Sequence, residues 1–65
     1  MQRYAVAWMN YHENVLVIEF VEASSRLEAV SKVLDWLVDC SSYEDACQTA
    51  FDGDMNVCAR VVEWE

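Results

Sequence analysis

Residues 3–21 read RYAVAWMNYHENVLVIEFV, and this stretch predicts a β-hairpin. Positions 3–9 and 15–21 are dense in β-branched and aromatic residues, which favour strands. The five positions between them, 10–14, are polar and predict the connecting loop. The rest of the chain is therefore expected to build on a pair of antiparallel strands.

A signal for the start of a helix follows the hairpin. Ser25-Arg26-Leu27-Glu28 matches a capping box, in which the Ser25 hydroxyl accepts the amide of Glu28 while the Glu28 carboxylate reaches back. Apolar residues recur at helical spacing behind it and predict an amphipathic helix over about residues 26–39. Its apolar side is expected to consist of Leu27, Val30, Val33, Leu34, Leu37 and Val38. Glu28 and Lys32 are four residues apart, a favourable spacing for an ion pair on a helix.

A second start signal, at residues 41–45, predicts a short helix, which Gly53 is expected to end in a left-handed conformation. Residues 55–64 then predict a third strand. The order β-β-α-α-β implies an α+β fold in a single domain over residues 1–65. We expect a three-stranded antiparallel sheet of order 2-1-3 with the helices packed on one face. The apolar side of the short helix is expected to consist of Tyr43, Ala46, Cys47, Ala50 and Phe51.

All three predicted strands are apolar on both sides, whereas a sheet with one solvated face alternates apolar with polar residues. Two short helices can cover only one face of such a sheet. We therefore expect the other face to be buried against a second copy, as a homodimer with two-fold symmetry. The alternative is a modestly exposed β-surface on a monomer. The residues expected in the interface are Ala5, Ala7, Met9, Val15, Val17, Val21, Val57 and Val61.

The charge balance bears on the class of partner. Twelve Asp and Glu against four Lys and Arg give a net charge of -8, and the hydrophobic fraction of 55% is too high for a disordered acidic tail. A field of this sign repels nucleic-acid phosphates and acidic membrane surfaces and attracts basic protein surfaces. We expect no direct binding to nucleic acid and none to a membrane.

The carboxylates are concentrated in one part of the chain. Residues 33–59 contain six of them and no Lys or Arg. Such a group can imitate a line of phosphates and occupy a basic groove; the alternative is a solvated helix face that serves solubility alone. The residues expected to bind a partner are Asp35, Asp39, Glu44, Asp45, Asp52 and Asp54, with Trp36 as an aromatic anchor.

The sequence offers little for catalysis or metal binding. Three cysteines, an odd number without a CxxC pair, indicate reduced thiols in a cytoplasmic protein. Residues 52–56 carry oxygen ligands at alternate positions, as in a calcium loop, but Val57 stands where that loop needs Gly. His12 has no ligand-pair spacing with any cysteine. We expect no enzyme activity, no metal and no cofactor.

In size and charge the chain is similar to phage-encoded inhibitors of host nucleic-acid-handling enzymes, a class that includes anti-CRISPR proteins and DNA mimics. The similarity involves no sequence motif. It implies a protein that docks on a basic surface of a larger protein and blocks it. The alternative is a structural or regulatory module that self-assembles through the apolar sheet face.

Overall fold

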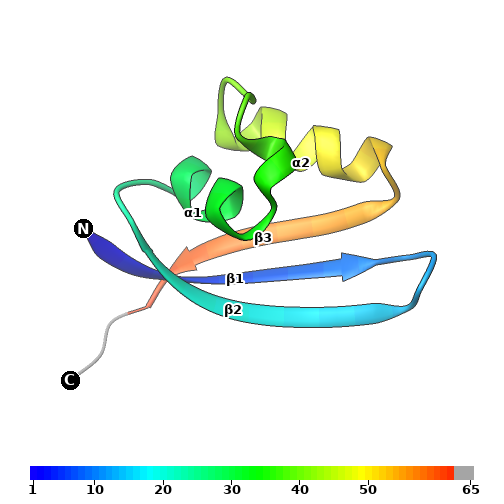
Figure 1. The fold of residues 1–65 in the computed structure, drawn as a ribbon, viewed down its shortest axis with the longest axis horizontal. Helices are drawn as coiled ribbons and strands as arrows, with labels where there is room; N and C mark the ends of the chain where they lie inside the picture. The colour runs from blue at the N-terminus through cyan, green and yellow to red at the C-terminus, as the bar shows by residue number, and fades with distance from the viewer. Residues whose placement is uncertain (63–65) are drawn as a thin grey trace.

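The computed structural model describes residues 1–62 and confirms the α+β fold. All strand pairs are antiparallel and the strand order is β2-β1-β3, as predicted. Figure 1 shows the two α-helices on one side of the sheet. The elements are β1 (Gln2–Asn10), β2 (Val15–Ala23), α1 (Arg26–Val33), the 3-10 turn η1 (Asp35–Leu37), α2 (Tyr43–Asp52) and β3 (Met55–Val61).

The β1–β2 loop fixes which residues share a face. Asn10 lies opposite Val15, so the loop has four residues, 11–14. The Asn10 side-chain oxygen accepts the amides of His12 at 2.9 Å and Glu13 at 3.3 Å. Asn14 takes the left-handed conformation with φ 56°, which asparagine tolerates better than most residues. With this register every even-numbered residue of β1 lies opposite an odd-numbered residue of β2.

The helices cover the face that carries Tyr4 and Val6 on β1. On β3, Ala59 opposite Val6 and Val57 opposite Trp8 are buried on the same face. The helical layer closes this core with side chains that are fully buried. They are Ala29, Val30, Leu37, Ala46 and Ala50.

The predicted interface set is wrong in one respect, because it mixes the two faces of the sheet. Ala5, Ala7 and Met9 do lie on the face away from the helices. A four-residue loop pairs Ala7 with Ile18, not with an odd-numbered residue, so the other five positions fall on the covered face. The five misplaced residues are Val15, Val17, Val21, Val57 and Val61.

The helix expected over residues 26–39 is also wrong in its length. α1 ends at Val33, because Leu34 adopts an extended conformation with φ -119° and ψ 92°. The chain then bends through η1. The bend brings both Leu34 and Leu37 into the core, but it leaves Val38, which was expected on the apolar side of the helix, exposed.

The second helix begins as predicted, and the Ser42 hydroxyl accepts the amide of Asp45 at 3.0 Å. Two expectations at its other end are wrong. Phe51 is exposed, because the buried contact is centred on Ala46 and Ala50 and Phe51 lies at its margin. The left-handed residue is Asp54, with φ 64°, and Gly53 has φ -95°.

The hairpin loop holds Asp54 in this conformation. The Asp54 carbonyl accepts the amide of Tyr11 at 3.0 Å, and its carboxylate lies 2.7 Å from His12 Nε2. Aspartate also tolerates the left-handed region better than most residues. The turn before β3 is therefore fixed by contacts from the opposite end of the chain, which the local sequence does not reveal. The predicted third strand, residues 55–64, ends at Val61, and positions 63 and 64 lie outside the described residues.

Candidate interaction surfaces

All six predicted partner-binding carboxylates are exposed, and all belong to the helical layer. Two are in and just after η1, two are in the first turn of α2, and two are at the end of α2 and in the turn after it. We call them the acidic surface. Its members are Asp35, Asp39, Glu44, Asp45, Asp52 and Asp54.

No Lys or Arg among residues 1–62 pairs with the acidic surface. Asp45 accepts the amide of Ser41 at 3.1 Å, and Asp52 accepts the side-chain amide of Gln48 at 3.0 Å. Asp54 is the member that contacts a titratable base, His12. The negative charge of this surface is thus left largely uncompensated.

The cations on the helical side of the molecule are engaged elsewhere. Lys32 lies 3.7 Å from Glu28, and its Nζ donates to the Glu22 carbonyl at 2.6 Å. The Arg26 guanidinium lies 5.5 Å from the centre of the Tyr43 ring. Arg26 thus extends from α1 to the first residue of α2, but it forms no ion pair with the acidic surface within residues 1–62.

Helix stability accounts for part of the acidic surface but not for all of it. Glu44 and Asp45 occupy the first turn of α2, where the helix dipole favours negative charge. Asp52 occupies the last turn, where the dipole opposes negative charge by about 0.3–1 kcal/mol, and no basic residue accompanies it. The dipole therefore disfavours Asp52 at this position, and its hydrogen bond from Gln48, four residues earlier, offsets part of that cost.

Three exposed apolar side chains lie in the same η1–α2 region. Trp36 is 50% exposed, and its ring packs beside Gly53 at the end of α2. Val38 and Phe51 are 64% and 58% exposed. The sequence indicated Trp36 as an anchor but missed the other two, because helical periodicity assigned both to the core. The break at Leu34 that exposes Val38 has no Pro or Gly to signal it.

The face of the sheet away from the helices is the second candidate surface, and we call it the open face. On β2 it presents Leu16, Ile18 and Phe20, which are 62%, 59% and 55% exposed. The sequence-based set omitted these three residues. The remaining members of the open face are Arg3, Ala5, Ala7, Met9, Glu22, Asn56, Cys58 and Arg60.

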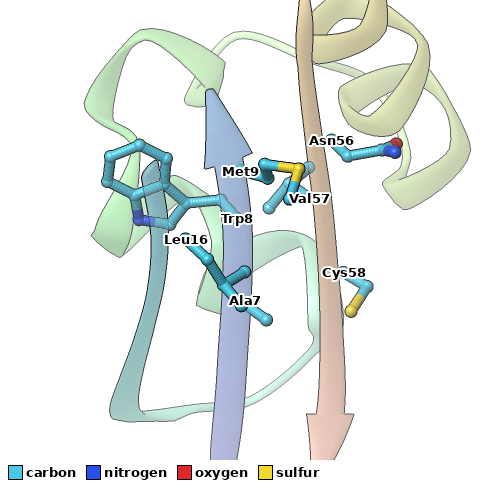
Figure 2. Close-up of a pocket in the computed structure, with 7 residues that line it drawn as sticks. All are labelled: Ala7, Trp8, Met9, Leu16, Asn56, Val57 and Cys58. Atoms are coloured by element: carbon cyan, nitrogen blue, oxygen red, sulfur yellow. The ribbon is translucent and has the colours of Figure 1, made fainter. Parts of the chain in front are cut away.

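A shallow depression of about 340 Å³ lies on the open face. Figure 2 shows Leu16, Ala7 and Cys58 across its floor, with Met9 and Asn56 at one end. The depression exists because Ala7 and Cys58 are small while Leu16 beside them is large. Nearly all its side chains are apolar or weakly polar, so it offers no set of acids and bases for catalysis.

The two edges of the sheet differ. On β3, the Ala59 amide donates to the Tyr43 hydroxyl at 2.9 Å, and the Cys47 thiol donates to the Val57 carbonyl at 3.5 Å. Burial raises the pKa of the Tyr43 phenol above its ordinary value. On β2, Lys32 covers a single carbonyl, that of Glu22. Side chains of α2 thus protect the β3 edge more fully.

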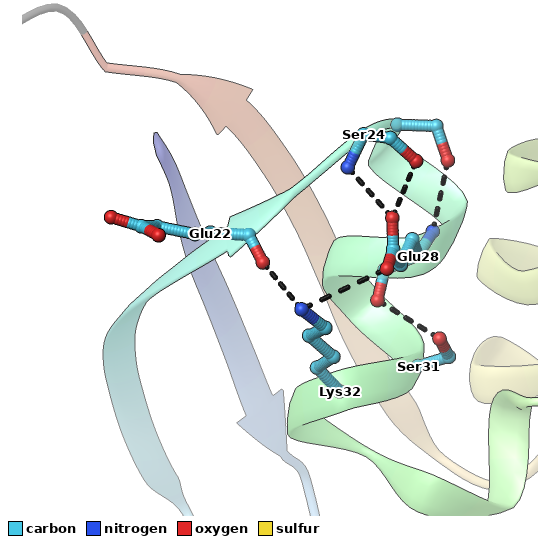
Figure 3. A network of polar contacts seen from close by, with 6 residues as sticks. Glu22, Ser24, Glu28, Ser31 and Lys32 are labelled. Atoms are coloured by element: carbon cyan, nitrogen blue, oxygen red, sulfur yellow. Dashed lines mark hydrogen bonds and ion pairs between the residues drawn. The ribbon is translucent and has the colours of Figure 1, made fainter. Parts of the chain in front are cut away.

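The start of α1 carries a hydrogen-bond network, shown in Figure 3. The Ser25 hydroxyl accepts the Glu28 amide at 3.1 Å, as the capping box predicts. The Glu28 carboxylate accepts the Ser24 hydroxyl at 2.5 Å and the Ser24 amide at 2.7 Å, one residue before the expected partner. These bonds, with a smaller contribution from Lys32, lower the pKa of Glu28 below its ordinary value. The network is structural and involves no cavity.

Within residues 1–62 no three His, Cys, Asp or Glu side chains lie close enough together to hold a metal ion. His12 is in the hairpin loop, and the cysteines are the unpaired Cys40, Cys47 and Cys58. Asp52 and Asp54 flank a tight turn into β3, and this turn does not form a calcium loop.

Among residues 1–62, no helix is both long enough and apolar enough to cross a bilayer.

Comparison of the sequence and structure with known proteins finds no relative. No family model, no curated protein and no solved structure matches the chain. The acidic surface and the open face are therefore the two features from which its function has to be argued.

Proposed function

We propose that this chain is a non-enzymatic acidic binding protein. It docks through the acidic surface on a basic, nucleic-acid-handling surface of a larger protein and blocks it. The observation that carries this proposal is the grouping of six exposed carboxylates in the helical layer with no Lys or Arg paired to them. The three cysteines, which form no disulfide, suit a chain that acts in the cytoplasm.

The charge density of the acidic surface supports a phosphate mimic. The ten residues of α2 extend over about 15 Å at about 1.5 Å per residue, and four of the carboxylates lie on this helix or in the turn after it. That is about one charge per 4 Å, the same order as the one phosphate per 3.4 Å on a nucleic-acid strand. A groove lined with Lys and Arg for phosphates would therefore meet a similar field.

Exposed apolar groups beside the carboxylates would supply short-range contact. Trp36, Val38 and Phe51 are exposed in the region that carries the charge. Long-range attraction speeds association, whereas buried aromatic anchors hold a complex together. The acidic surface thus combines the two kinds of contact that a stable inhibitor needs.

The test compares two variants with the same change in net charge. Asp35→Lys/Asp39→Lys alters the acidic surface, and the side chains of both residues make no hydrogen bond within residues 1–62. Glu13→Lys/Glu19→Lys is the matched control, because both residues are exposed but lie in the hairpin loop and on β2. Each protein is immobilised as bait in a cell lysate, and bound proteins are eluted with a salt gradient and identified by mass spectrometry.

We expect the natural chain and the control to retain the same basic protein and Asp35→Lys/Asp39→Lys to lose it. Adding the natural chain to that purified protein should then displace its nucleic acid. The proposal is wrong if both double variants retain the protein equally, or if the nucleic acid stays bound when the chain is in excess.

A further inference from the structure

We propose that the open face is the contact between two copies of this chain, packed face to face so that the β2 ridge of each copy enters the trough of the other. The ridge is the row Leu16, Ile18 and Phe20. The trough is the neighbouring row of small residues, Ala5 and Ala7 on β1 and Cys58 on β3. This inference does not depend on what the acidic surface binds.

The shape of the open face complements itself. At the middle of the face the large Ile18 stands beside the small Ala7 and Cys58, and the depression of about 340 Å³ lies there. Met9, Asn56 and Arg60 bound the trough at its two ends. A two-fold axis that runs along the strands exchanges ridge and trough, so that each ridge fills the partner's trough. An axis across the strands would instead place ridge on ridge and leave both depressions empty.

The distribution of charge points to a second copy as the occupant. The chain carries a net charge of -8, and the acidic surface lies in the helical layer. The open face carries Arg3, Arg60 and one carboxylate, Glu22, which lies 3.8 Å from Arg3. Two copies that meet through this face keep their acidic surfaces apart and outward. The two arginines disfavour a basic partner, and in the dimer Glu22 beside Arg3 offsets part of the repulsion between the arginines of the two copies.

The area suits a weak but specific dimer. Strands about 4.8 Å apart that rise about 3.3 Å per residue give the face a footprint of roughly 14 × 23 Å. Two such footprints amount to about 640 Å², and the relief of the ridge raises the buried area toward the roughly 1,000 Å² that is the lower limit for a specific interface. Aligned sheets pack about 10 Å apart, and that spacing accommodates one layer of interdigitated side chains.

The first test is the mass of the protein in solution, measured by sedimentation from about 1 μM to about 500 μM, a range that covers weak dissociation constants. We expect a monomer–dimer equilibrium. Ile18→Lys should raise the dissociation constant of the dimer at least tenfold, because it places a charge in the apolar ridge. Val38→Lys is the control, because Val38 is similarly exposed but lies off this face, and it should leave the equilibrium unchanged. Circular dichroism should show that both variants are folded.

The second test fixes the arrangement. In the proposed dimer Ile18 lies at the level of the partner's Cys58, because Ala7 pairs with both residues within one chain. A bifunctional thiol reagent with a span of about 10 Å, the spacing of packed sheets, should therefore cross-link Ile18→Cys dimers, and the additional change Cys58→Ser should abolish the cross-link. A monomer at every concentration, a dimer that survives Ile18→Lys, or a cross-link that survives Cys58→Ser would overturn the proposal.

Discussion

The two faces of the sheet are built from the same strands and the same kinds of residue, yet only one is covered. On the helix side Val6 and Val57 are buried by the chain's own helices. On the other side Leu16 and Ile18 remain more than half exposed. The difference shows that the helical layer is large enough for one face and no more, so an apolar strand pattern by itself does not reveal which face is the core.

The charged residues also differ between the two sides of the molecule. The acidic surface belongs to the layer that covers the sheet, whereas the open face carries two arginines and one glutamate. Opposite sides of the molecule are thus suited to different interactions, one electrostatic and one apolar. Such interactions respond in opposite ways to salt, and this makes them separable by experiment.

The largest expected effect comes from the same mutation made on each side. Leu37→Ala removes a fully buried side chain from beneath the helices and should lower the free energy of unfolding by about 2–5 kcal/mol. Leu16→Ala on the open face should cost less than about 0.5 kcal/mol. Urea unfolding at low micromolar concentration, where the dimer dissociates, measures both. Equal losses would show that the two faces are not different.

Much of the division between the faces could be predicted from the sequence, and the errors have definite causes. The two helix starts follow from local patterns, the strand order follows from the simplest connection between the elements, and the structure confirms both. Which side chains of β2 lie on the open face depends on whether the hairpin loop contains an odd or an even number of residues. The polar stretch 10–14 does not fix that number. A loop one residue longer would have brought Val17 to the open face.

The helical layer was harder to predict than the sheet. No Gly or Pro marks the break at Leu34, which depends on the tertiary packing of Leu34 and Leu37. The exposure of Phe51 has the same origin, because Ala46 and Ala50 occupy the centre of the contact. The placement of the six carboxylates in this layer was foreseeable, since each lies at a polar position or in a turn.

A smaller loss of stability is expected when the hydrogen bond between α2 and the β3 edge is removed. Tyr43→Phe removes the hydroxyl that accepts the Ala59 amide and should cost about 1–2 kcal/mol. Tyr11→Phe is the matched control, because the Tyr11 hydroxyl bonds the exposed Asn56 side chain, which water can satisfy instead. Thermal unfolding of both variants measures the difference. A Tyr43 variant as stable as the Tyr11 variant would show that this edge needs no protection from α2.

The α1 network gives the covered side a pH dependence. The pKa of Glu28 is lowered in the folded state, so its stabilising effect is present above the carboxyl's ordinary pKa and is lost as pH falls through the folded pKa. Glu28→Gln should therefore differ most from the natural chain near neutral pH, and the difference should shrink as the pH falls through the folded pKa of Glu28. Unfolding curves recorded across this range provide the measurement. If the difference in stability between the two proteins were the same at all pH values, Glu28 would be excluded as the source of the pH dependence.

The smallest effect is expected at the turn between α2 and β3. At Gly53, with φ -95°, an added Cβ would lie 3.5 Å from the Ala50 carbonyl oxygen, an ordinary contact. Gly53→Ala should therefore change stability by less than about 0.5 kcal/mol, or raise it slightly through the unfolded state. Asp54→Ala, at φ 64°, should cost about 1 kcal/mol or more. The opposite order, in a thermal scan of both, would contradict the backbone conformation described for this turn.

The most direct test of the contrast between the two sides is the dimer fraction at one protein concentration, measured by sedimentation at low and at high salt. Salt screens the repulsion between two chains of charge -8 and leaves apolar burial intact. If the chain dimerises through the apolar open face, the dimer fraction should rise between about 0.05 M and about 0.5 M sodium chloride. A fraction that falls as salt is added, or a monomer at both concentrations of salt, would contradict it.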